Sequence, residues 1–113
     1  MLCPCNATIP FDACCGPYLR GEKPTPTAEA LMRSRYSAFA TGNMAYLSAT
    51  QTSADPITAP DVTWSGLEIL SVERGTASDH DGYVEFLARY DHTEVMHERA
   101  YFKKINGRWV YWV

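Results

Sequence analysis

The sequence predicts an α+β fold, in which helices come first and a long antiparallel sheet follows. Residues 28–41 carry apolar side chains at the i, i+3, i+4, i+7 spacing of a half-buried helix. From residue 65 onward apolar and polar residues alternate, which is typical of strands with one buried face. Asn106-Gly107 is a strong signal for a two-residue hairpin turn between two such strands. A curved sheet wrapped on a long helix forms a cone, so we expect a cone-shaped domain.

The expected helices are bounded by start and stop signals. Thr27 is a good N-cap for the helix over 28–41, and Gly42 suits its C-terminal end. A second helix is expected over 44–50. Residues 51–63 contain serine, aspartate and proline residues that interrupt any periodicity, so they predict a loop, with room for a short third helix.

Four strands follow, and their short connections predict an antiparallel meander. Their expected ranges are 65–76, 83–91, 95–105 and 108–113. Alternation in the first strand predicts that Leu67, Ile69 and Ser71 share one face. The same rule places Glu98 on the face of Phe102 in the third strand.

Length and composition limit the classes of protein that fit the sequence. The chain has 113 residues, which suits one domain with a small appendage, and 46% apolar residues provide material for a core. Its net charge of −3 argues against general binding to the phosphate backbone of nucleic acids. The chain has no long apolar run that would span a membrane. Leu2 leads directly into Cys3 and Pro4 without a signal sequence, so we expect a soluble protein of the reducing cytoplasm.

All four cysteines lie close together near the N-terminal end, in the pattern Cys3-Pro4-Cys5, eight residues, and then Cys14-Cys15. Four thiolates in two close pairs suit a tetrahedral Zn²⁺ ion, with Zn–S distances of about 2.3 Å. One alternative is a pair of disulfides such as Cys3–Cys14 with Cys5–Cys15, which would suit a secreted protein. Another is a redox dithiol, although its usual Cys-x-x-Cys spacing is missing. We favour zinc as the cofactor, with all four cysteines as ligands.

This cysteine pattern resembles the SEC-C zinc motif at the C-terminal tail of the SecA translocation ATPase, although the spacer here lacks lysines. The run Leu-Met-Arg-Ser-Arg-Tyr-Ser-Ala-Phe over 31–39 further resembles the YchJ family, as do His97-Glu98-Arg99 and residues 107–111. Members of this family are bacterial proteins without a settled biochemical role. The resemblance implies a SEC-C-like zinc knuckle over 1–19, a linker over 20–26 and a nuclear transport factor 2-like α+β domain over 27–113.

A cone of this kind has an interior in which a ligand can bind. Glu98 shares a face with Phe102, and a carboxylate among apolar side chains needs a partner. We expect that partner to be Arg35 or Arg33 from the long helix, unless both arginines reach solvent through their flexible stems. The predicted pocket for a small polar ligand is lined by Arg33, Arg35, Tyr36, Trp64, Glu98 and Trp109. The simpler interpretation is that the ion pair orients helix on sheet and the aromatic residues fill the core, without catalytic residues.

The sequence favours a binding module over an enzyme, since it contains no nucleophile–base triad, phosphate-binding glycine loop or dinucleotide motif. The first hypothesis is a zinc-stabilised adaptor whose knuckle presents Ile9 and Phe11 to a protein partner. The second is a small-molecule-binding or enzymatic cavity that uses Glu98 and Arg35. The third is weak nucleic-acid binding by the knuckle, against which the acidic balance argues.

Overall fold

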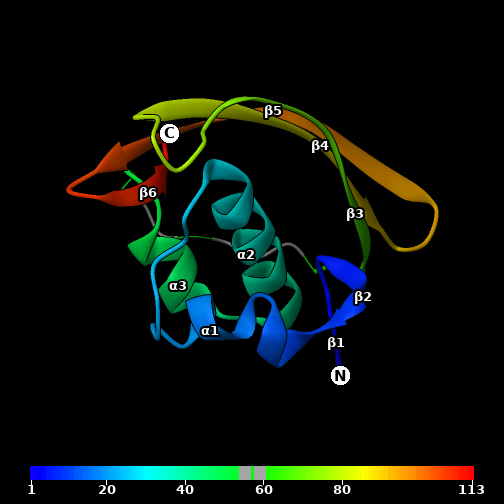
Figure 1. Cartoon of the computed structure of the whole chain (residues 1–113). Helices are drawn as coiled ribbons and strands as arrows, with labels where there is room; N and C mark the ends of the chain where they lie inside the picture. Colours follow the sequence, from blue (N-terminus) through cyan, green and yellow to red (C-terminus); the bar gives the residue numbers. More distant parts are fainter. Residues whose placement is uncertain (54–56, 58–60) are drawn as a thin grey trace.

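The computed structural model describes residues 1–53, 57 and 61–113. Its elements are β1 (Leu2–Cys3), β2 (Asn6–Pro10), a 3₁₀ turn (Phe11–Ala13), α1 (Gly16–Leu19), α2 (Ala28–Thr41), α3 (Met44–Ala49), β3 (Trp64–Arg74), β4 (Asp81–Tyr90), β5 (Glu94–Ile105) and β6 (Arg108–Tyr111). Figure 1 shows the sheet of β3 to β6 arching over α2, while β1, β2 and α1 lie on the other side of that helix. The predicted α+β fold class is confirmed. Within 51–63, where a short helix was possible, residues 54–56 and 58–60 lie outside the described residues.

Helix α2 has the bounds that its local signals predict. The Thr27 side chain accepts a hydrogen bond from the Ala30 amide at 3.0 Å and so caps the first turn. Gly42 adopts a left-handed conformation with φ 78° and ends the helix. Most residues of α2 are buried, which makes it the central element of the molecule. None of the helices in the described part of the chain, α2 included, is long and apolar enough to cross a membrane.

The sheet is an antiparallel meander in the order β3-β4-β5-β6, as the short connections predict. The turn between β5 and β6 has φ 52° at Asn106 and φ 79° at Gly107, and a tight hairpin turn requires both positive values. Apolar side chains on the inner faces of β4 and β5 are buried against α2, namely Val84, Phe86, Ala88, Ala100 and Phe102. The inner face of the sheet and α2 therefore enclose the interior of the cone.

One predicted strand face is wrong, because β3 contains a β-bulge. Ile69 pairs with Phe86, but the next pair along the ladder joins Ser71 to Glu85, so Leu70 is an extra residue in β3. The extra residue moves Ser71 to the outer face, away from the face of Ile69. There its hydroxyl donates a hydrogen bond to the Glu85 carboxylate at 3.1 Å.

A single core joins the N-terminal segment to α2 and the sheet. It contains Cys3, Cys5 and Cys15 together with Leu31, Tyr36, Phe86, Phe102 and Trp109. The linker over 20–26 is also packed, since Thr25 is buried and the Trp109 indole N–H donates to the Pro26 carbonyl at 3.3 Å. The N-terminal segment is therefore docked on the main body.

The residues after α3 cover the free edge of β6. The Tyr111 amide donates to the Thr50 carbonyl at 2.7 Å, and the Tyr111 carbonyl accepts a hydrogen bond from the Thr52 amide at 3.0 Å. Gln51 completes this short parallel bridge with Tyr111. The pairing brings the C-terminal end of α3 beside the interior of the cone.

Candidate metal centre and cavity

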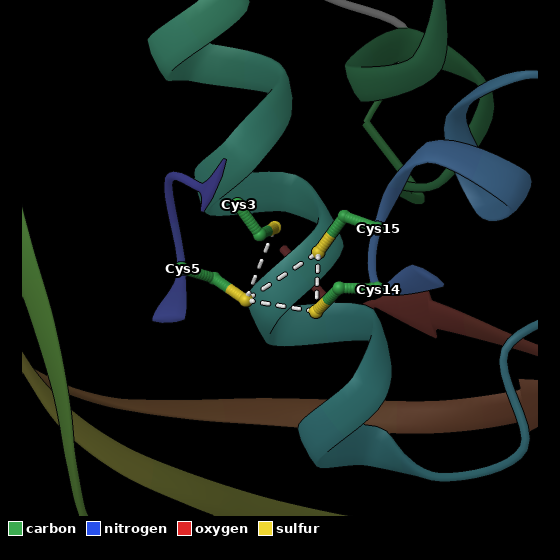
Figure 2. A group of neighbouring side chains, drawn as sticks. All are labelled: Cys3, Cys5, Cys14 and Cys15. Carbon is green, nitrogen blue, oxygen red and sulfur yellow. Dashed lines mark hydrogen bonds between the residues drawn. The ribbon is translucent and has the colours of Figure 1, made fainter. Parts of the chain in front are cut away.

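The four cysteine sulfurs form one compact group (Figure 2). Cys5 Sγ lies 3.6 Å from Cys3 Sγ and 3.5 Å from both Cys14 Sγ and Cys15 Sγ, while the last two are 4.0 Å apart. All four sulfurs lie within 4.8 Å of one another. A tetrahedral zinc ion with Zn–S bonds of about 2.3 Å separates its sulfurs by about 3.8 Å. The group therefore has the dimensions of a four-thiolate metal site.

Local backbone structure positions the two cysteine pairs. Strand β1 pairs with β2 and fixes Cys3, and Cys5 lies in the turn between these strands. Cys14 and Cys15 lie just before α1, and the Cys14 amide donates to the Phe11 carbonyl at 3.1 Å. A Cβ atom at Gly16 would lie 2.9 Å from the same Phe11 carbonyl oxygen, so this close approach of the backbone requires glycine.

Helix α2 supplies the outer contacts of the cysteine group. Ser37 is fully buried, and its hydroxyl lies 3.4 Å from Cys3 Sγ. One turn earlier, Arg33 donates to the Cys5 carbonyl at 3.0 Å and forms an ion pair with Glu29 at 2.9 Å. Positions 29, 33 and 37 lie on one face of a helix. This face of α2 therefore holds the N-terminal segment in place.

Three of the four cysteines are buried, and the thiols affect one another's pKa values. The pKa of Cys5 is lowered to about 5, mainly because the Cys15 thiol donates a hydrogen bond to its thiolate, although burial opposes this shift. The pKa of Cys15 is raised, mainly because ionisation would break the same hydrogen bond. Burial is the largest cause that raises the pKa of Cys14 to about 12. A metal cation would replace the protons that Cys14 and Cys15 retain at neutral pH.

The arrangement fits a closed metal site. Four protein sulfurs fill all positions of a tetrahedral ion and leave none open for a substrate. Among the residues that the structure describes, this is the one group of histidine, cysteine or acidic side chains that could hold a metal ion. The cluster is therefore capable of binding a metal in a structural role.

A separate cavity of about 300 Å³ lies between α2 and the inner face of the sheet. Four of the six predicted pocket residues, Arg35, Tyr36, Trp64 and Glu98, line it. The other two lie elsewhere. Arg33 contacts the cysteine group, and Trp109 is buried in the core beneath a wider groove between α3 and the β5–β6 hairpin.

Arg35 is almost entirely buried, with 6% of its surface exposed. Its guanidinium group donates to the Leu47 carbonyl at 2.9 Å, to Thr50 Oγ1 at 2.8 Å and to Gln51 Oε1 at 3.1 Å. Burial lowers its pKa to about 10, so it stays charged at neutral pH. The expected ion pair with Glu98 is not formed, and Arg35 does not reach solvent. The reason is that the end of α3 and the bridge after it offer three neutral oxygen acceptors nearer to its guanidinium group.

Tyr111 links the two charged groups of the cavity. Its ring centroid lies 4.9 Å from Arg35 Cζ, and its hydroxyl donates to Glu98 Oε2 at 3.1 Å. The Tyr36 hydroxyl accepts a hydrogen bond from the Gly66 amide at 2.9 Å. Besides apolar lining residues, the sequence prediction left out Tyr111, which is the residue that contacts both charged groups. Alternation along the last strand places it inward, but its contact with Arg35 depends on the tertiary fold.

The two predicted partner-surface residues differ in exposure. Ile9 is 36% exposed on β2, and Met1 and Leu2 of the same N-terminal segment are exposed as well. Phe11 is half-buried, because its side chain packs against the core and the backbone of Gly16. Phe11 is therefore a docking contact of the N-terminal segment, and only Ile9 remains on the surface.

The comparisons with known proteins agree with this architecture. A family model described as "YchJ, middle NTF2-like domain" matches residues 27–113. The chain belongs to the YchJ family. The UPF0225 protein of Streptomyces coelicolor is 42% identical over 116 residues, which cover 96% of this chain and 90% of that protein. A UPF0225 protein of Chromobacterium violaceum is 44% identical over 123 residues, covering 96% of this chain and 88% of that protein.

Two solved structures extend the similarity of this YchJ-family chain to the cysteine segment. The solution structure of a SEC-C motif containing protein from Rhodopseudomonas palustris has a TM-score of 0.85 at 30% identity and covers 100% of this chain and 96% of that one. The crystal structure of a SEC-C motif containing protein from Psychrobacter arcticus has a TM-score of 0.83 at 29% identity, with coverage of 98% and 80%. The nuclear transport factor 2-like body preceded by a cysteine motif is thus an architecture shared with these proteins.

Proposed function

We propose that the four cysteines bind a single Zn²⁺ ion, which fastens the N-terminal segment to α2 and stabilises the whole molecule. The observation that supports this proposal is the spacing of the four sulfurs, which brackets the separation expected for tetrahedral zinc. Thiolates are soft ligands, and zinc in such a closed site acts structurally and not as a catalyst.

The surroundings of the sulfurs suit the charge of the loaded site. A divalent ion with four thiolates carries a net charge of −2, and burial of this charge needs compensation. The Arg33 guanidinium group supplies positive charge beside Cys5. The Ser37 hydroxyl can donate to Cys3, because a thiolate has no proton of its own.

Metal analysis of purified, reduced protein tests the proposal. We expect one zinc per chain, and we expect Co²⁺ substitution to give the absorption of a tetrahedral thiolate site. Cys14→Ser should remove this absorption, whereas Ser53→Ala, outside the site, should keep it. Metal-free protein that contains two disulfides would overturn the proposal.

A second candidate function, an adaptor for a protein partner, is supported by the exposed apolar residues of the N-terminal segment. Met1, Leu2 and Ile9 are 85%, 54% and 36% exposed, and the zinc site would hold them in a fixed arrangement. A partner that binds the wild type stoichiometrically should be lost with Ile9→Asp. It should be retained with Ile105→Asp, which changes a residue of similar exposure (42%) at the end of β5, away from β2 (Figure 1). Retention by both variants would remove this candidate.

The proposal also places the protein in the cytoplasm, because metal-binding thiolates need a reducing compartment. A protein partner fits better than nucleic acid, since the chain carries a net charge of −3. The zinc site itself would not make the protein an enzyme, because its four protein ligands leave no position for substrate.

A further inference from the structure

We propose that the cavity between α2 and the sheet binds an uncharged, largely aromatic small molecule that donates a hydrogen bond to Glu98. This inference is independent of the zinc site, which contacts α2 through Arg33 and Ser37, neither of which lines the cavity. It depends on the size of the cavity, on its walls and on the balance of its two charges.

The cavity is too large to be a packing defect. Protein cores contain few voids larger than a water molecule, and one water needs only about 10–15 Å³. The volume of about 300 Å³ lies at the lower end of the range for ligand pockets. Met96 lines the cavity and is 39% exposed, which places its solvent-facing end at that residue. A molecule the size of two fused rings suits this space.

The walls favour an aromatic ligand. The Tyr36 and Trp64 rings meet edge to face with centroids 5.7 Å apart, and Phe39 lies 6.1 Å from Trp64. All three side chains line the cavity, with the apolar Met32 and Phe86. Aromatic rings prefer edge-to-face or offset contacts at these distances, so a flat ring system would extend the existing cluster.

The charges of the cavity favour a neutral ligand. Arg35 contributes one positive charge and Glu98 one carboxylate, and Tyr111 contacts both groups. Among the described residues, Arg35 has neutral hydrogen-bond partners and Glu98 forms no ion pair. The two charges therefore balance each other across Tyr111. A ligand of either sign would leave an uncompensated charge in a mostly apolar site, which costs free energy.

Glu98 is the polar group best placed to orient such a ligand. It lies between Met96 and Ala100 on the inner face of β5, midway between the exposed end of the cavity and its buried end. Its Oε2 atom accepts the Tyr111 hydroxyl, and a carboxylate has further lone pairs on both oxygens. A hydroxyl or amino group on the ligand can donate to them.

Methyl NMR on the zinc-loaded chain of 113 residues provides the first test, with 2-naphthol as the probe. The chain has four methionines, and Met32 and Met96 line the cavity whereas Met1 and Met44 do not. We expect 2-naphthol to shift the methyl signals of Met32 and Met96 and to leave those of Met1 and Met44 unchanged. Shifts spread over all four methionines, or no shifts at millimolar probe, would overturn the proposal.

Matched probes test the ligand class. We expect 2-naphthol to bind about tenfold more tightly than 2-methoxynaphthalene, which has no donor, because a hydrogen bond to a charged group is worth at least about 1.4 kcal/mol. The anion 2-naphthoate and the cation 2-naphthylmethylammonium should bind more weakly than 2-naphthol. If either charged probe binds more tightly, the neutral-ligand assignment is wrong.

Variants test the location. Ala100→Leu and Ala88→Leu each place a larger side chain in the cavity and should reduce 2-naphthol binding at least tenfold, whereas Ala77→Leu in the exposed β3–β4 turn should not. Glu98→Met should remove the preference for 2-naphthol over 2-methoxynaphthalene and retain binding of both. If the folded variants Ala100→Leu and Ala88→Leu bind 2-naphthol as tightly as the wild type, the probe binds elsewhere. Zinc content measured on the same samples keeps these outcomes separate from the metal site.

Discussion

Removal of the Ser37 hydroxyl tests how α2 supports the metal site. Ser37 is fully buried, and its oxygen lies 3.4 Å from Cys3 Sγ. A hydrogen bond to a charged acceptor contributes about 1.5–3 kcal/mol, and a sulfur acceptor at this distance belongs at the lower end. Loss of about 1.4 kcal/mol corresponds to a tenfold loss of affinity. Ser37→Ala should therefore weaken zinc binding about tenfold, within the range typical of outer contacts around a metal site.

Ser34→Ala is the matched control for this experiment. Ser34 is equally buried in α2, but its hydroxyl donates to the Leu31 carbonyl at 2.8 Å and lies 2.7 Å from the Tyr46 hydroxyl. The control should lower the free energy of unfolding by about 1 kcal/mol and leave zinc affinity unchanged. Competition against a chromophoric chelator measures the affinity, and urea unfolding measures the stability. Equal zinc affinity in wild type and Ser37→Ala, or equal losses in both variants, would show that the Ser37 contact does not support the metal.

Three further predictions concern burial, pH and metal removal. Arg35→Met should lower the free energy of unfolding by about 2–4 kcal/mol, because it removes three hydrogen bonds of a buried charged group. The control Arg89→Met, on the exposed face of the sheet, should change this free energy by less than about 0.5 kcal/mol. Urea unfolding of both variants measures the difference. Zinc affinity should rise at least about a hundredfold per pH unit near neutrality, because Cys14 and Cys15 have raised pKa values without metal and must each release a proton on binding. Chelator competition at pH 6.5, 7.0 and 7.5 checks the slope, and a flat profile would exclude proton release from both thiols. Removal of zinc should lower the stability of the whole chain by about 4 kcal/mol relative to a zinc concentration 1,000-fold above its dissociation constant, and melting curves with and without chelator measure this difference. A melting temperature that does not depend on zinc would mean that the metal does not support the fold.

The sequence predicted those features that depend on local signals. The helix over 28–41 begins at Thr27 and ends at Gly42 as expected, because a capping side chain and a left-handed glycine act on adjacent backbone. The Asn106-Gly107 turn was equally predictable, since positive φ angles at both positions define the hairpin. The four cysteines lie close together in the sequence, and this local spacing indicated a compact group of sulfurs.

The features that the sequence did not predict depend on contacts between distant segments. The bulge at Leu70 follows from the pairing of β3 with β4, and it reverses the face of Ser71. Arg35 found neutral acceptors after α3 instead of Glu98, because the bridge between Gln51 and Tyr111 brings those acceptors into the cone. Ser37 has no sequence signal for a role at the cysteines, since only the docking of the N-terminal segment on α2 brings them together.

The environment of the metal can be measured by X-ray absorption spectroscopy of the purified protein at the zinc edge. If the four cysteines hold one zinc ion against α2, the spectrum should fit four sulfur neighbours at about 2.3 Å with no nitrogen or oxygen neighbour. A shell that contains light-atom ligands, or fewer than four sulfurs, would show that the cysteine group does not close around the ion.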